Sequence, residues 1–161
     1  MDRLRKFLGL DWQERYLFLQ TVFVVMSLRA ALGLLPFKQV NDLLSHRAQR
    51  RRALRNISKT RVIWAVRTAS ALLPGSTCLT QALAARYQLE RCGLNTQLHF
   101  GVAKKEDGRL LAHAWLQCDG EALIGGEIAS RFAPVLALNY LNLPSILHTR
   151  SLIRSRSLTK T

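Results

Sequence analysis

The stretch "CLTQALAARYQLERCGLNTQLHFGVA", residues 78–103, decides the fold, because the period of its apolar residues changes inside it. As far as Cys92 the apolar spacing is helical, and Gly93 is the kind of residue that ends a helix. From residue 96 onward, apolar and polar residues alternate as they do in a half-buried strand. The stretch therefore predicts a helix followed directly by a strand.

Helices are predicted on the N-terminal side of this stretch. Residues 12–34 form one long apolar run, which Gly33 and Pro36 bring to an end. A second helix is marked by apolar residues between Val40 and Ile57. Ser58 can cap a third helix. The residues "PGST" break the third helix, and either Ser76 or Thr77 can cap a fourth that runs to Cys92.

Strands are predicted on the C-terminal side. "LLAHAWLQC" (residues 110–118) alternates, Asp119-Gly120 is a tight-turn signal, and "EALIG" is the return strand. The residues after Gly126 show no regular pattern. The expected fold class is α+β: N-terminal helices, then a cysteine-bearing helix and a small antiparallel sheet. In domain terms we expect a helical segment at 1–60, a core at 61–147 and a basic tail at 148–161.

The chain of 161 residues carries a formal net charge of +14. Acidic residues are absent between Leu43 and Leu89, and arginines crowd one face of the second helix. Such a face favours an anionic partner, which can be an acidic peptide, nucleic acid or a membrane surface. The alternative is an ordinary solvated helix face. No aromatic-interleaved basic strand accompanies the charge, so nucleic acid is not expected.

The apolar run at 12–34 has two interpretations. Gln20 and Arg29 interrupt it, and we expect a helix buried against the domain rather than a membrane span. Peripheral contact with a membrane is the alternative. The three cysteines match no disulfide framework and no zinc spacing, so a cytoplasmic location without a metal or other cofactor is expected.

Cys78 falls in the first turn of the fourth helix, where unpaired N–H groups and the helix dipole favour a thiolate. The alternative is an inert, buried cysteine. A nucleophilic thiol needs a base. Of the four histidines, His46 and His148 lie in basic, solvated contexts, and His99 fits the rim of a strand. His113, set between alanines and before Trp115, is either the base or a satisfied core histidine.

A cysteine that opens a helix, followed by a histidine on a strand, resembles the papain-like and transglutaminase-like superfamily. Within it, the chain resembles the microcin-processing leader peptidases of lasso-peptide pathways. The resemblance rests on "CLTQALAARYQLERCGLNTQLHFGVAK" and "LLAHAWLQCDGEALIGGE", both within residues 78–127. It implies a cysteine protease that removes the leader from a precursor peptide, with Cys78 as nucleophile and His113 as general base and acid. It also implies a small leader-binding partner protein and an ATP-dependent macrocyclase.

The third catalytic residue departs from this family's pattern. The family has an aspartate twelve residues after the histidine, where this chain has Gly125. Asp119 lies at the predicted hairpin tip, about 20 Å from His113 along an extended strand. Glu127 comes opposite His113 if the turn has three residues or a bulge occurs. We therefore expect Glu127 to orient His113, unless a backbone carbonyl or an amide side chain does so.

Two other functions fit the residues less well. The same thiol chemistry can transfer an acyl group to an amine, and a non-enzymatic basic module would explain the charge alone. Cys92 and Cys118 are expected to be structural. A zinc site can be written from four residues, but no ligand spacing supports it. These residues are Cys78, Cys118, His99 and His113.

Overall fold

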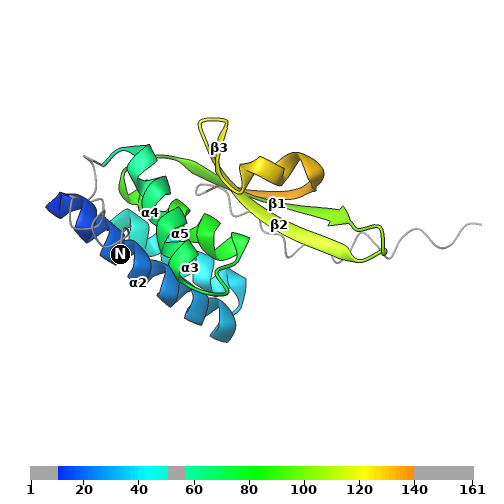
Figure 1. Cartoon of the computed structure of the whole chain (residues 1–161), viewed down its shortest axis with the longest axis horizontal. Helices are drawn as coiled ribbons and strands as arrows, with labels where there is room; N and C mark the ends of the chain where they lie inside the picture. The colour runs from blue at the N-terminus through cyan, green and yellow to red at the C-terminus, as the bar shows by residue number, and fades with distance from the viewer. Residues whose placement is uncertain (1–10, 51–56, 140–161) are drawn as a thin grey trace, which may run out of the picture.

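The computed structural model describes residues 11–50 and 57–139, in which four helices pack together beside a four-stranded antiparallel sheet (Figure 1). The elements are α2 (Trp12–Leu34), α3 (Phe37–Arg50), α4 (Lys59–Leu72), α5 (Cys78–Arg91), β1 (Thr96–Lys104), β2 (Leu110–Cys118), β3 (Glu121–Ile124), the 3-10 helix η1 (Gly126–Arg131) and β4 (Ala133–Asn139). The expected α+β order is confirmed.

The helix ends follow the predicted caps. The Ser58 hydroxyl accepts from the backbone N–H of Arg61 at the start of α4. Thr77 caps α5, accepting from the N–H of Thr80 at 3.2 Å, so Cys78 is the first residue of that helix. Gly93 has a φ of 85°, in the left-handed region that glycine adopts without strain.

The sheet has the strand order β3-β2-β1-β4. β1 and β2 pair so that Gly101 lies opposite His113 and His99 opposite Trp115. Asp119, with a φ of 51°, and Gly120, with a φ of 80°, form the turn between β2 and β3. Positive φ at both central residues is the signature of a two-residue hairpin turn.

β4 corrects the expectation that the residues after Gly126 are irregular. It pairs with β1, and its alternation places Leu136 and Leu138 toward the core. Pro134 obscures the pattern, because proline is tolerated only at the edge of a sheet. β4 is such an edge, so its proline costs no hydrogen bond to a further strand.

The two faces of the sheet differ. Side chains alternate along a strand, and those of one face join the core formed with the helices; they include Leu98, Leu116, Cys118 and Leu138. Trp115 and its neighbours His99 and His113 lie on the other face, where their rings stack. The middle of β2, from His113 to Leu116, is thus buried on both sides.

Buried polar contacts fasten the first two helices to α5. Gln88 on α5 donates to the Thr21 hydroxyl on α2 at 3.2 Å. Arg86 on α5 donates to the Asn41 side chain on α3 at 2.8 Å. Buried polar groups need such partners, so these bonds fix how α2 and α3 sit on the cysteine-bearing helix.

Candidate active site

Cys78 is the first residue of α5 and is half-buried. The N-terminus of a helix presents backbone N–H groups and the positive end of the helix dipole. Thr77 satisfies one of these groups, the N–H of Thr80. The thiol therefore lies in the first turn of this helix, as expected from the sequence.

His113 lies near the middle of β2 with only 9% of its surface exposed. Its ring stacks on Phe132, which follows η1, with a centroid separation of 4.9 Å. Trp115 flanks it on the same strand face, with centroids 6.1 Å apart. Two aromatic rings therefore limit the orientations that the imidazole can take.

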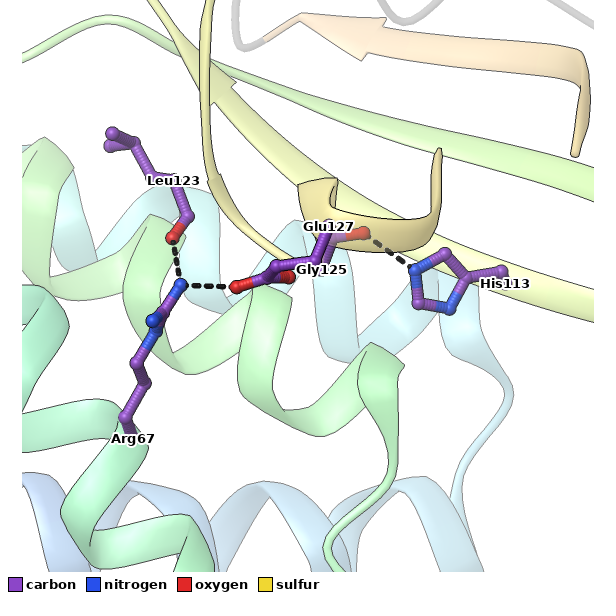
Figure 2. Close-up of polar contacts among 5 residues, drawn as sticks. All are labelled: Arg67, His113, Leu123, Gly125 and Glu127. Carbon is purple, nitrogen blue, oxygen red and sulfur yellow. Dashed lines mark hydrogen bonds and ion pairs between the residues drawn. The ribbon is translucent and has the colours of Figure 1, made fainter. Parts of the chain in front are cut away.

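A hydrogen bond of 2.8 Å joins His113 Nε2 to the backbone carbonyl of Gly125 (Figure 2). A carbonyl oxygen can only accept, so Nε2 must carry the proton of this bond. In the neutral ring Nδ1 then has a free lone pair. The backbone of Gly125 thus selects the tautomer in which Nδ1 is the base.

Only glycine fits at position 125. Its φ of 73° lies in the left-handed region, and a Cβ there would come 2.8 Å from the carbonyl oxygen of Ala114. The same Cβ would lie 3.1 Å from His113 Nε2. The residue that replaces the aspartate of the resembled family therefore lies directly against the imidazole.

Glu127, the expected orienter, is placed elsewhere. Its carboxylate forms an ion pair of 2.5 Å with Arg67 of α4, and Arg67 also donates to the Leu123 carbonyl at 3.2 Å (Figure 2). The β2–β3 register does shift by one residue, between Leu116 and Gln117. By count the shift aligns Glu127 with His113, but β3 ends at Ile124 and the chain turns into η1 first. The polar partner of the ring is consequently a backbone carbonyl, the alternative that the sequence left open.

α5 and β2 pack against each other, and their C-terminal ends lie close together. Glu90, near the end of α5, bonds to Thr96, which pairs with Cys118. From that end, Cys78 is about 18 Å back along the helix. His113 is about 17 Å back along the strand.

The thiol and the imidazole are nevertheless not joined in this structure. α5 covers the sheet face that carries Leu116, and alternation puts His113 on the other face. No hydrogen bond links Cys78 to His113 within the described residues. The structure therefore places the two on adjoining elements without bringing their side chains together.

The other two cysteines are poor nucleophiles. Burial raises the pKa of the Cys92 thiol, which Arg91 offsets in part. Burial also raises the pKa of Cys118, and its hydrogen bond to Asp119 raises it further. Both thiols therefore stay protonated at neutral pH, which agrees with a structural role.

Of the other described histidines, His99 lies in an aromatic stack and His46 is exposed. His99 stacks on Trp115 at 5.4 Å, and burial lowers its pKa, with a hydrogen bond to Gln117 acting in the opposite direction. His46 is exposed on α3. His148 lies outside the described residues.

Within residues 11–50 and 57–139, no three His, Cys, Asp or Glu side chains gather as a metal site would require. Cys118 faces the helices, whereas His99 and His113 lie on the opposite sheet face. The four residues from which a zinc site could be written are therefore divided between the two faces.

The family profile of the transglutaminase-like superfamily matches residues 22–137, which is more than half of the chain. The chain belongs to the transglutaminase-like superfamily. The match includes the helix that begins at Cys78, the His113 strand and Gly125. Neither the curated proteins nor the solved structures gave a significant match. Membership of the superfamily indicates a cysteine-protease-like or transglutaminase-like activity, without specifying a substrate.

Arg67, Phe132 and the Gly125 carbonyl are the site components that the sequence did not single out. A carbonyl has no sequence signature, and Arg67 lies 60 residues before its partner Glu127. The one available signal was the glycine itself, which stands where the resembled family has a carboxylate. In this transglutaminase-like protein, the glycine at that position provides the carbonyl that bonds to the His113 imidazole.

Proposed function

We propose that the protein is a cysteine peptidase that removes the leader from a lasso-peptide precursor, with Cys78 as nucleophile and His113 as general base and acid. The observation that supports this most is the bond between His113 Nε2 and the Gly125 carbonyl. It leaves Nδ1 as the basic nitrogen, on the strand beside the helix that Cys78 opens.

The proposed reaction has two steps. The Cys78 thiol gives its proton to His113 Nδ1, and the sulfur attacks the scissile carbonyl. His113 returns the proton to the leaving amine as the peptide bond breaks, which leaves a thioester on Cys78. Water then attacks the thioester with His113 again acting as base, so the thiol is regenerated and the acyl fragment leaves as a carboxylate.

Catalysis requires the sulfur and the imidazole to come within hydrogen-bond reach. β3 ends at Ile124, whose partner is Leu116. The residues of β2 that precede Leu116, His113 among them, therefore have no β3 neighbour. In this proposal the two side chains meet at this edge when substrate binds, which requires the start of α5 to reach the sheet face where Gly125, Phe132 and Trp115 hold the His113 ring. Catalytic hydrogen bonds that are long without substrate commonly tighten when substrate binds.

Gly125 and Glu127 have different roles in this proposal. The Gly125 carbonyl orients the ring in place of a carboxylate. It accepts a hydrogen bond from Nε2–H in both the neutral and the charged state of the imidazole. Glu127 holds η1 to α4 through Arg67. The carbonyl has no full negative charge, so it stabilises the imidazolium less than an aspartate would.

The partners of the proposed reaction follow from the resemblance. They are the precursor peptide, a small leader-binding protein and an ATP-dependent macrocyclase that receives the core peptide. The strongly basic chain suits an acidic precursor or an acidic partner surface. The reaction would take place in the cytoplasm, where the three free thiols stay reduced.

Acyl transfer to an amine is a second candidate, because the superfamily includes transglutaminase-like chemistry. The thioester on Cys78 is common to both reactions, and only its acceptor differs. Mass spectrometry of the products distinguishes the two. Hydrolysis adds one water and gives two free peptides, whereas transfer gives a new amide.

The experiment is cleavage of a candidate lasso-peptide precursor by the purified protein, with a candidate leader-binding protein present. We expect two peptides from the wild-type protein and from the Cys92→Ala and Cys118→Ala variants. Cys78→Ala and His113→Ala should reduce the rate to background. Full cleavage by Cys78→Ala would overturn the proposal.

A further inference from the structure

A line of exposed apolar side chains runs along α2, at alternating spacings of four and three residues from Trp12 to Met26, and ends at Leu34. We call it the α2 stripe; its large members are Trp12, Tyr16, Leu19, Phe23, Met26 and Leu34. Each is more than half exposed, from 54% at Met26 to 84% at Leu34. The stripe is about 33 Å long. An apolar line of this extent is uncommon on a free surface and marks a site of interaction.

The opposite side of α2 is already committed to the protein core. Leu17, Val25 and Leu28 are buried, and Thr21 bonds to Gln88 of α5. By length and composition α2 could also cross a membrane, but core helices satisfy the same criteria. Crossing would remove these side chains from the core. Only the α2 stripe is therefore free to meet a surface, with the helix lying flat on it.

A hollow at the C-terminal end of the stripe adds a cation to this apolar surface. Its walls are Met26, Arg29, Ala30, Gly33, Leu34 and Leu73. The Arg29 guanidinium lies against Gly75, so close that a Cβ there would be 2.8 Å from Nη2. A guanidinium beside apolar walls suits a phosphate headgroup whose acyl chain enters the hollow.

The charges favour a lipid surface over a second copy of the chain. Each chain carries +14, so pairing two stripes would bring strong like charges together. Glu14, the only acidic residue of α2, is neutralised by Arg61 at 2.7 Å. Trp12 and Tyr16, at one end of the stripe, are the residue types that favour a membrane–water interface. We infer that the α2 stripe docks this protein on an anionic lipid surface, with Arg29 at the headgroups.

The test is vesicle flotation of the full chain at low and high salt. Vesicles of phosphatidylglycerol with phosphatidylethanolamine are compared with vesicles of phosphatidylcholine. We expect binding to the anionic vesicles that weakens with salt. The double substitution Leu19→Ser with Phe23→Ser should lower it at least tenfold, and Arg29→Gln a few-fold. The matched control is Leu110→Ser with Val135→Ser, which removes exposed apolar side chains from the sheet.

Three results would overturn the inference: no binding to anionic vesicles, equal binding by the two double variants, or binding that ignores salt. Sedimentation equilibrium identifies the other occupant, because a dimer that Leu19→Ser with Phe23→Ser abolishes would assign the stripe to a second copy. Unchanged urea midpoints show that the variants are folded. Precursor cleavage without vesicles is measured separately, so this inference and the peptidase proposal can fail independently.

Discussion

At the scale of single residues, Gly125 combines a backbone conformation with a hydrogen bond to the candidate base. Its φ of 73° turns the chain out of β3, and this turn directs the carbonyl at His113 Nε2. An aspartate at position 125 would bond to the ring through its side chain, whose rotamer would have to be fixed. The glycine instead presents a main-chain carbonyl, so no side-chain rotamer entropy is lost in placing the acceptor.

Gly125→Ala is expected to destabilise the protein and to lower leader removal. The left-handed conformation alone costs a non-glycine residue about 1–2 kcal/mol. The Cβ also overlaps the Ala114 carbonyl and crowds His113, which displaces the ring. Urea denaturation and the cleavage rate measure the two effects.

Gly108→Ala is the matched control. Gly108 has a φ of 81°, but a Cβ there would meet nothing within 4 Å. It should lose stability for the same conformational reason and retain the cleavage rate. Equal loss of activity in the two variants would contradict a specific role of Gly125 at the imidazole.

The site residues with reactive side chains could be proposed from the sequence. Cys78 and His113 were chosen from their order and their neighbours, and the structure puts them on the expected helix and strand. Their partner could not be chosen, because a one-residue bulge and the end of β3 decide which atom reaches the ring. Neither event leaves a pattern in a single sequence.

At the scale of elements, the start of α5 determines where the thiol lies. Thr77 caps this helix, and its hydroxyl also lies 3.0 Å from that of Thr80. A lost N-cap lets the first turn fray, and Cys78 belongs to that turn. The cap therefore links helix stability to the position of Cys78, the proposed nucleophile.

Thr77→Ala should lower the free energy of unfolding by about 1 kcal/mol. Since the frayed turn carries Cys78, the cleavage rate should fall as well. Ser58→Ala removes the corresponding cap of α4 and should cost similar stability while sparing activity. If Ser58→Ala lowered cleavage as much as Thr77→Ala, global destabilisation would explain both results.

The helices and strands with capping residues or clean alternation were predictable, whereas β4 was not. Ser58, Thr77 and Gly93 act locally, so their effect can be read from neighbouring residues. β4 owes its place to pairing with β1, about 35 residues earlier, and its proline hides the alternation. Whether these residues form a strand therefore depends on contacts with a distant part of the chain, which a local sequence pattern does not show.

At the scale of the whole molecule, α2 is part of the same core as the site. Val25 and Leu28 of α2 pack in one cluster with residues of α4, α5 and the sheet. The Thr21 hydroxyl donates to the Leu17 carbonyl at 2.7 Å and accepts from Gln88. α2 is therefore expected to unfold together with α5, the helix that begins at Cys78.

Thr21→Ala should cost about 1–3 kcal/mol, because it leaves the buried Gln88 amide without its partner. Ser27→Ala, an exposed change on the same helix, should be close to neutral. Urea unfolding followed by circular dichroism gives both values. A separate early transition in Thr21→Ala would show that α2 unfolds independently, against this account.

The central claim is that Cys78 forms the covalent intermediate. The most direct measurement is acid quenching of the protein during precursor cleavage, followed by intact-mass analysis and peptide mapping of the adduct. The account predicts one acyl fragment on the Cys78 peptide and none on the peptides of Cys92 or Cys118. An adduct on either of those cysteines, or precursor cleavage that persists in Cys78→Ala, would contradict it.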